Sequence, residues 1–86
     1  MMTIKQCLKA ELMIFAIDHD FFAYGSSCKK MKNGKYRAHV EGEDYDYTLH
    51  QLAEEFDTID DLDKKNIIDY YYEKELKTFR FQTTNS

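Results

Sequence analysis

The chain has 86 residues, of which 12 are basic and 16 acidic, and its formal net charge is −4. A chain of this length buries only about 60–65% of its unfolded surface, so we expect one domain over residues 1–86, with residues 83–86 frayed. This size argues against a second domain, a solenoid and a large active-site cavity. Apolar residues make up 43% of the chain, which argues against full disorder.

No segment of the sequence is suited to crossing a membrane or to forming a disulfide framework. The longest strongly apolar run is Leu12–Ile17, well short of the ~20 residues that a membrane span needs. Two cysteines, Cys7 and Cys28, are typical of a reducing compartment. We therefore expect a cytoplasmic protein with no membrane partner. Proline is absent and glycine is scarce, so the elements should be few and long.

The first predicted element is a helix over residues 3–17. Thr3 is suited to cap its first turn, although the run 12–17 is equally consistent with a buried strand. The stretch Asp18–Asp20 is a polar break, and its central His19, between two carboxylates, is either a general base or part of a polar loop. The apolar residues at helical spacing are Ile4, Cys7, Leu8, Leu12 and Phe15.

The dipeptide Asn33-Gly34 predicts a β-hairpin next in the chain. Both residues tolerate the positive φ that a two-residue type I′ turn needs. We expect antiparallel strands over about 21–32 and 35–47, with one face buried. The second strand alternates, with Tyr36, Ala38 and Val40 on one face and Lys35, Arg37 and His39 on the other.

Two helices are predicted after the hairpin. Thr48 and Gln51 have the spacing of a capping box, and an amphipathic segment follows them. Thr58 repeats the capping pattern and predicts a longer helix to about Lys77, while the alternating segment 78–82 could add an edge strand. The fold class is therefore α+β, with an N-terminal helix, an antiparallel hairpin or small sheet, and two C-terminal helices packed on it. The apolar side of the last helix is marked by Ile68, Tyr72, Leu76 and Phe79.

The cysteines and histidines do not predict an enzyme or a metal site. They lack the short spacing of structural zinc ligands. In the two-residue hairpin register Cys28 lies opposite His39, but no third group is evident to orient the imidazole. The glycines form no phosphate-binding loop. We expect no catalytic residues, no metal and no cofactor.

Charge is divided unevenly along the chain. Residues 1–40 contain seven basic and three acidic residues, a net +4, whereas residues 41–77 contain four basic and 13 acidic, a net −9. Such carboxylates can imitate nucleic-acid phosphates in a basic groove of another protein. The tyrosines at 70–72 spread over about 200° of a helix, so at least one should be exposed for contact with a partner. The candidate partner-binding residues are Glu43, Asp44, Tyr45, Asp46, Asp60, Asp61, Asp63, Tyr70 and Tyr71.

In size, acidity and tyrosine content the chain is similar to the small inhibitors of phages and mobile elements, including anti-CRISPR and anti-restriction proteins. This resemblance implies a non-catalytic inhibitor or adaptor that binds a protein, such as a nucleic-acid-binding protein with a basic groove. Seven tyrosines and six phenylalanines exceed what a small core needs, which leaves a homodimer open.

A small nucleic-acid-binding regulator is the alternative interpretation. Residues 47–56 resemble the first helix of the helix-turn-helix family, with a Leu-x-x-Leu-Ala pattern, so the helix pair 48–77 could bind DNA. The carboxylates of residues 60–63, however, would oppose DNA where a recognition helix reads bases. The hairpin tip, 29–37, offers cations for phosphates instead. The candidate anion-binding residues are Lys30, Lys32, Lys35 and Arg37.

Overall fold

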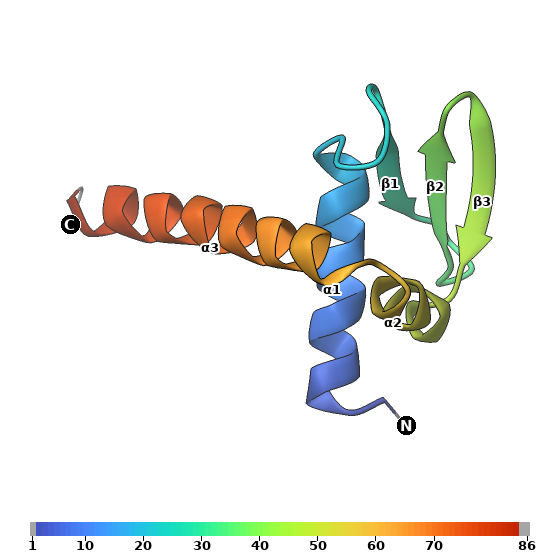
Figure 1. Cartoon of the computed structure of the whole chain (residues 1–86), viewed down its shortest axis with the longest axis horizontal. Helices are drawn as coiled ribbons and strands as arrows, with labels where there is room; N and C mark the ends of the chain where they lie inside the picture. The colour runs from blue at the N-terminus through green and yellow to red at the C-terminus, as the bar shows by residue number, and fades with distance from the viewer. Residues whose placement is uncertain (1, 85–86) are drawn as a thin grey trace.

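The computed structural model describes the backbone of residues 2–84 and the side chains of residues 2–75. In Figure 1, the first helix, the sheet and the second helix form one body, from which the last helix extends. The α+β fold predicted from the sequence is confirmed. The elements are α1 (Ile4–Asp18), β1 (Ser27–Lys30), β2 (Tyr36–Val40), β3 (Glu43–Tyr47), α2 (Leu49–Asp57) and α3 (Asp61–Thr84).

Helix α1 begins at a capping box and includes the run 12–17, so the helical interpretation of that run is confirmed. Thr3 Oγ1 accepts the backbone N–H of Gln6 at 3.1 Å, and Gln6 Oε1 accepts that of Thr3 at 2.9 Å. The predicted apolar stripe is wrong at its start, because Ile4 is 90% exposed. Burial depends on where other elements cross α1, which helical periodicity alone does not reveal. The buried residues of α1 are Ala10, Leu12, Ala16 and Ile17.

The segment between α1 and β1 is fastened by the aspartates of the predicted polar break. Asp18 Oδ1 accepts the backbone N–H of Cys28 at 2.6 Å, and Asp20 accepts another backbone N–H of the loop at 2.9 Å. His19 instead stacks on Phe15, with ring centroids 4.0 Å apart. The two carboxylates therefore hold the connection to the sheet and do not form the general-base arrangement considered for His19.

The sheet has three antiparallel strands in the order β1-β2-β3, which confirms the small sheet of the predicted alternatives, although the sequence located only two strands. The predicted strand 35–47 is divided at Glu41-Gly42, where φ is 53° and 81°. Two successive positive φ angles are characteristic of a type I′ turn, so the tight turn expected earlier in the chain lies here. Residues 21–26, predicted as the start of the first strand, form an irregular loop.

The Asn33-Gly34 turn is longer than predicted. Gly34 has a φ of 86°, but Asn33 has no positive φ, so the turn is not type I′. The N–H of Gly34 donates to the carbonyl of Met31 at 3.0 Å, and the N–H of Met31 donates to the carbonyl of Lys35 at 2.7 Å. Residues 32–34 thus form a three-residue loop, the arrangement in which a type I turn is followed by a left-handed glycine.

This loop shifts the pairing of β1 and β2 by one residue from the predicted register. Cys28 lies opposite Ala38, and Ser27 lies opposite His39. Because a one-residue slip moves a side chain to the other face, the predicted Cys28–His39 pairing is wrong. We call the face that carries Cys28 and Ala38 the covered face and the opposite one the outer face. The outer face carries Ser27, Lys29, Arg37, His39, Asp44 and Asp46.

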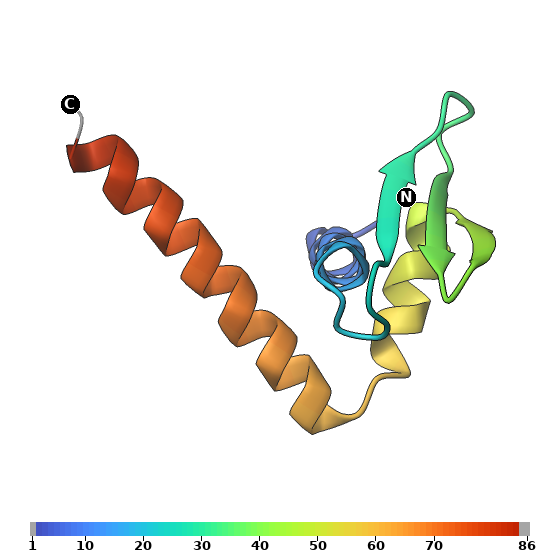
Figure 2. The ribbon, with the colours of Figure 1, turned by 90° about the horizontal axis from the view of Figure 1, so that it is seen from above.

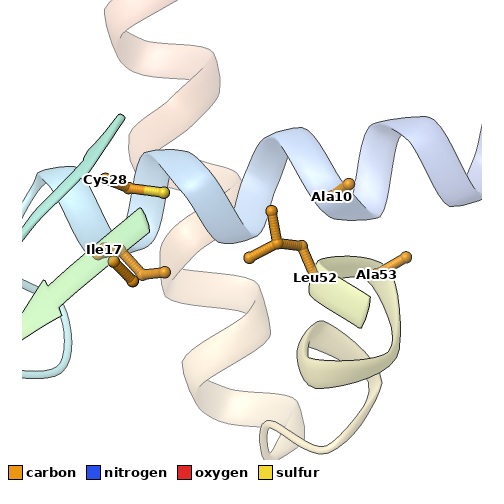
Figure 3. Packing of buried hydrophobic residues seen from close by; sticks show 6 residues of the cluster. Ala10, Ile17, Cys28, Leu52 and Ala53 are labelled. Carbon is orange, nitrogen blue, oxygen red and sulfur yellow. The ribbon is translucent and has the colours of Figure 1, made fainter. Parts of the chain in front are cut away.

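Helices α1 and α2 pack on the covered face. Cys28 and Ala38 are buried there beside Ile17 of α1, and Figure 3 shows Leu52 of α2 pointing toward α1. Leu52 is 0% exposed. The small side chains of the strands allow the helices to approach closely, which places this core between the sheet and the two helices.

The two C-terminal helices differ in how well their starts were predicted. Thr48 Oγ1 accepts the N–H of Gln51 at 3.1 Å, as expected for the capping box of α2. Thr58 ends α2 and does not begin the next helix. Asp60 caps α3, because its Oδ1 accepts the N–H of Asp63 at 2.9 Å. A carboxylate is as good an N-cap as a hydroxyl group, so both Thr58 and Asp60 were possible caps for this helix.

Helix α3 extends to Thr84, where the sequence predicted an end near Lys77 and an edge strand over 78–82. Its 24 residues span about 36 Å. Ile67 is fully buried and packs with α1, as does Tyr71, and the C-terminal part of the helix then extends away from the body (Figures 1 and 2). Outside the described part lie the side chains of Leu76 and Phe79 and, from the predicted frayed end, residues 85–86.

Candidate functional site

The residues predicted on the acidic surface form two groups. The β3 group, residues 43–46, lies on β3, which leads into the first turn of α2. The second acidic group lies at the start of α3, after the last turn of α2, and consists of Asp60, Asp61 and Asp63. The nine residues of α2 span about 13 Å. Figures 1 and 2 show β3 and the start of α3 apart in both views. A partner would therefore meet them as two surfaces.

Two carboxylates of the β3 group are paired with the side chains of Arg37 and His39 of β2 on the outer face. Arg37 donates to Asp46 through Nε at 2.8 Å and Nη2 at 3.1 Å. This hydrogen-bonded contact lowers the pKa of Asp46 and raises that of Arg37. His39 Nδ1 lies 2.7 Å from Asp44 Oδ1. Both carboxylates are thus engaged within the sheet.

The other two members of the β3 group lie on the opposite side of the strand, at its edge. The Tyr45 hydroxyl donates a short hydrogen bond to the Glu43 carboxylate. This bond, together with the nearby negative charge, raises the pKa of Tyr45. Both side chains are exposed, so this pair is the part of β3 that remains open to a partner.

The second acidic group lies at the beginning of α3. Asp60 serves as the cap, whereas Asp61 and Asp63 are exposed and have no ion pair with any described side chain. Carboxylates at a helix N-terminus are stabilised by the positive end of the macrodipole. Helix formation accounts for their placement and leaves two of the three carboxylates facing solvent.

The three consecutive tyrosines of α3 divide between a cluster and solvent, which confirms that at least one is exposed. The rings of Tyr70 and Tyr71 lie 5.6 and 5.2 Å from that of Phe15 on α1. Phe21, from the loop after α1, lies 5.7 Å from Tyr70. Tyr72 is 56% exposed. Tyr70 and Tyr71 therefore hold α3 against α1, and Tyr72 is the member that faces solvent.

The candidate anion-binding residues do not share one face of the hairpin. Arg37 lies on the outer face, while Lys30 pairs with Tyr36 and belongs to the covered side. Lys32 and Lys35 lie in and beside the three-residue loop. The register separates these cations, which the sequence had grouped together.

The helix pair compared with a helix-turn-helix consists of α2 and the first part of α3. Both helices contact α1, where Phe56 of α2 and Ile67 of α3 are buried in one cluster. Asp61 and Asp63 are exposed at the start of the second helix. A recognition helix contacts bases from this end, and carboxylates there oppose the DNA phosphates. The arrangement disfavours DNA binding by α3.

Sequence reasoning missed a shallow depression on the outer face. Its volume is about 270 Å³, and it is lined by Ser27, Lys29, Arg37, His39 and Asp44. Ser27, His39 and Asp44 form one row across the three strands. The alternation of β2 contained part of this signal, but Ser27 and Lys29 join it only in the observed register.

The row has the residue order of a nucleophilic triad but not its contacts. No hydrogen bond joins Ser27 to His39 among the described side chains, and such a bond is what activates a serine. The His39 and Asp44 side chains are 49% and 56% exposed. The row therefore presents polar side chains to solvent, and no hydrogen bond activates Ser27 as a nucleophile.

The thiol considered as a ligand or nucleophile is buried. Burial raises the pKa of Cys28 to about 11, with a smaller contribution from the Asp18 carboxylate. A buried, protonated thiol is unreactive and a poor metal ligand at neutral pH. Within residues 2–75, no three His, Cys, Asp or Glu side chains gather as a metal site.

Comparison with known proteins shows no relative of this chain. No protein-family model matches it, and neither a curated protein nor a solved structure matches it. No helix in the described residues has both the length and the apolar character to cross a bilayer.

Proposed function

We propose that the protein is a non-catalytic binding module that docks helix α3 against a partner protein. Two observations support this proposal. The C-terminal part of α3 extends away from the body (Figures 1 and 2), and the part that packs on α1 also has apolar side chains facing solvent. Leu62 is 68% exposed and Tyr72 is 56% exposed. Since helices in proteins are stabilised mainly by packing, a helix that leaves its own core is suited to packing on another protein.

The proposed partner has a basic surface with apolar recesses. Asp61 and Asp63 are exposed on the first turn of α3, and residues 41–77 carry a net charge of −9. Opposite charge on the partner would steer association. Burial of Leu62 and Tyr72 would supply affinity, because aromatic and apolar anchors dominate interface energetics.

Inhibition of a nucleic-acid-binding protein is the more specific form of this proposal. A basic groove that binds phosphates would also accept the carboxylates of α3, and the occupied groove would then exclude nucleic acid. This form rests on the resemblance in size and charge to phage and mobile-element inhibitors, including anti-CRISPR proteins. It places the protein in the cytoplasm, beside such a target.

Affinity capture from a cytoplasmic extract with matched variants tests the α3 surface. The double change Leu62→Ala/Tyr72→Ala should reduce capture of the partner at least about tenfold. Asp61→Asn/Asp63→Asn should weaken capture and flatten its dependence on salt. The matched control is Asp44→Asn/Asp46→Asn, because these carboxylates are already paired with His39 and Arg37.

The opposite pattern would overturn the proposal. Capture that survives the α3 changes but is lost in the β3 double variant would move the contact to the sheet. Circular dichroism would verify that each variant folds. Light scattering of the purified chain would show whether the captured partner is a second copy, the homodimer left open by the sequence.

Direct nucleic-acid binding is a second candidate, favoured by one observation on the hairpin. None of Lys30, Lys32 and Lys35 has an ion pair among the described side chains. Fluorescence anisotropy with short DNA and RNA at low salt tests this candidate. Saturable binding that Lys32→Gln/Lys35→Gln abolishes would support it, and an unchanged anisotropy would remove it.

A further inference from the structure

The outer face of the sheet carries a group of hydrogen-bond donors that the α3 proposal does not use. They surround the depression of about 270 Å³ that Ser27, Lys29 and His39 help to line. Helices α1 and α2 pack on the covered face, so the depression faces solvent. We propose that this depression binds the phosphoryl group of a small molecule, with Ser27, Lys29 and His39 as the donors.

The charge on Lys29 is the first reason to expect an anion. Lys29 lies directly opposite Arg37 in the register, and directly opposed like charges destabilise a strand pair. Arg37 is compensated on its other side by the bidentate contact with Asp46. Lys29 has no ion pair with any described side chain. A bound anion would supply the missing negative charge.

The row next to Lys29 supplies two more donors. Ser27 lies opposite His39, and facing side chains of a strand pair have Cβ atoms about 4.5–5.5 Å apart. Asp44 engages His39 through Nδ1 at 2.7 Å, which orients the ring and leaves Nε2 for a ligand. A protonated histidine donates from both nitrogens, so Nε2 would then donate to the ligand.

The shape and charge of the depression indicate the class of anion. Lys29, Ser27 and His39 approach from different positions on two strands, which suits the several oxygens of a phosphoryl group. The volume and the open outer face suit a phosphate monoester of a small molecule and leave no room to enclose a larger one. The Asp44 carboxylate also lines the depression and would repel an anion. Its hydrogen-bond contact with His39 offsets part of that repulsion.

Titration of the full chain with inorganic phosphate and with glycerol 3-phosphate, followed by NMR, tests the site. The amide signals of Ser27, Lys29 and His39 should shift together and saturate, with chloride holding the ionic strength constant. Lys29→Gln should weaken binding at least about tenfold. Lys30→Gln is the matched control, since Lys30 is the next residue on the same strand but pairs with Tyr36 on the covered side. It should change affinity less than about twofold.

Three results would overturn the proposal. Signals that do not shift at millimolar phosphate would exclude the site. Equal weakening by Lys29→Gln and Lys30→Gln would indicate general attraction to a lysine-rich hairpin. Saturable binding of a short single-stranded oligonucleotide, without binding of either small phosphate, would favour nucleic acid instead.

Ser27→Ala provides a second test, because it removes a donor without changing charge and should also weaken phosphate binding. None of these outcomes depends on whether α3 binds a partner protein.

Discussion

The two faces of the sheet are made by the same three strands, yet one is core and the other presents charge. On the covered face Cys28 and Ala38 are small and buried, and the helices pack against them. On the outer face Arg37 and His39 pair with carboxylates in solvent. Successive side chains of a strand point to opposite faces. A single residue of register therefore separates a core position from an exposed position on the outer face.

The strongest test of this contrast is a truncation on the covered side. Leu52→Ala should destabilise the protein by about 2–5 kcal/mol, because Leu52 is 0% exposed and its loss leaves a cavity between α1 and α2. Urea unfolding at neutral pH measures the change. Asp46→Asn on the outer face is the control and should leave the midpoint close to that of the unmodified chain. Equal losses for the two variants would contradict the contrast.

The next effect is a dependence of stability on alkaline pH. The Cys28 thiol has a pKa of about 11 in the folded protein, against an ordinary value of 9.0. Between these values the unfolded chain releases a proton that the folded chain keeps. The free energy of unfolding should therefore fall as pH rises through this interval, by about 1–3 kcal/mol.

Urea unfolding at pH 8, 9, 10 and 11 measures this fall, with two variants for comparison. Cys28→Ala should have a flatter profile than the unmodified chain. Cys7→Ala should retain the full slope, because Cys7 is exposed on α1. A Cys28→Ala profile as steep as that of the unmodified chain would place the titrating group elsewhere.

The smallest effect concerns the turns that set the register. Gly42 and Gly34 have φ of 81° and 86°, and an added Cβ would meet nothing within 4 Å at either position. Alanine at either position should therefore cost about 1–2 kcal/mol through backbone conformation alone. Asparagine, which tolerates the left-handed region, should lose less. Thermal unfolding of the alanine and asparagine variants tests this order, and equal losses would point to packing instead.

Much of the fold was predictable because its signals are local. The capping boxes at Thr3 and Thr48 each join residues three positions apart. The box at Thr48 and the capping role of Thr3 were both predicted correctly. The Asn33-Gly34 turn was also located correctly, although not its loop length. The second turn was missed because Glu41 is an unusual residue for positive φ, so Gly42 alone did not indicate a two-residue turn.

The candidate sites were less predictable because they depend on pairing between distant segments. Cys28 and His39 were placed together, yet Ser27 is the residue that lies beside His39. Asp44 and Asp46 were predicted to bind a partner, but in the folded chain their carboxylates contact His39 and Arg37. A list of charges does not indicate which of them are already paired.

The sequence by itself determined the α+β class, the positions of the helix starts at Thr3 and Thr48, and the uneven division of charge. These depend on neighbouring residues and on side-chain composition, which are present in the chain before it folds. Only the tertiary structure decided the register of the sheet, and with it the face on which Lys29 and Cys28 lie. It also decided which part of α3 packs on α1, because packing depends on contacts between segments that the sequence holds far apart.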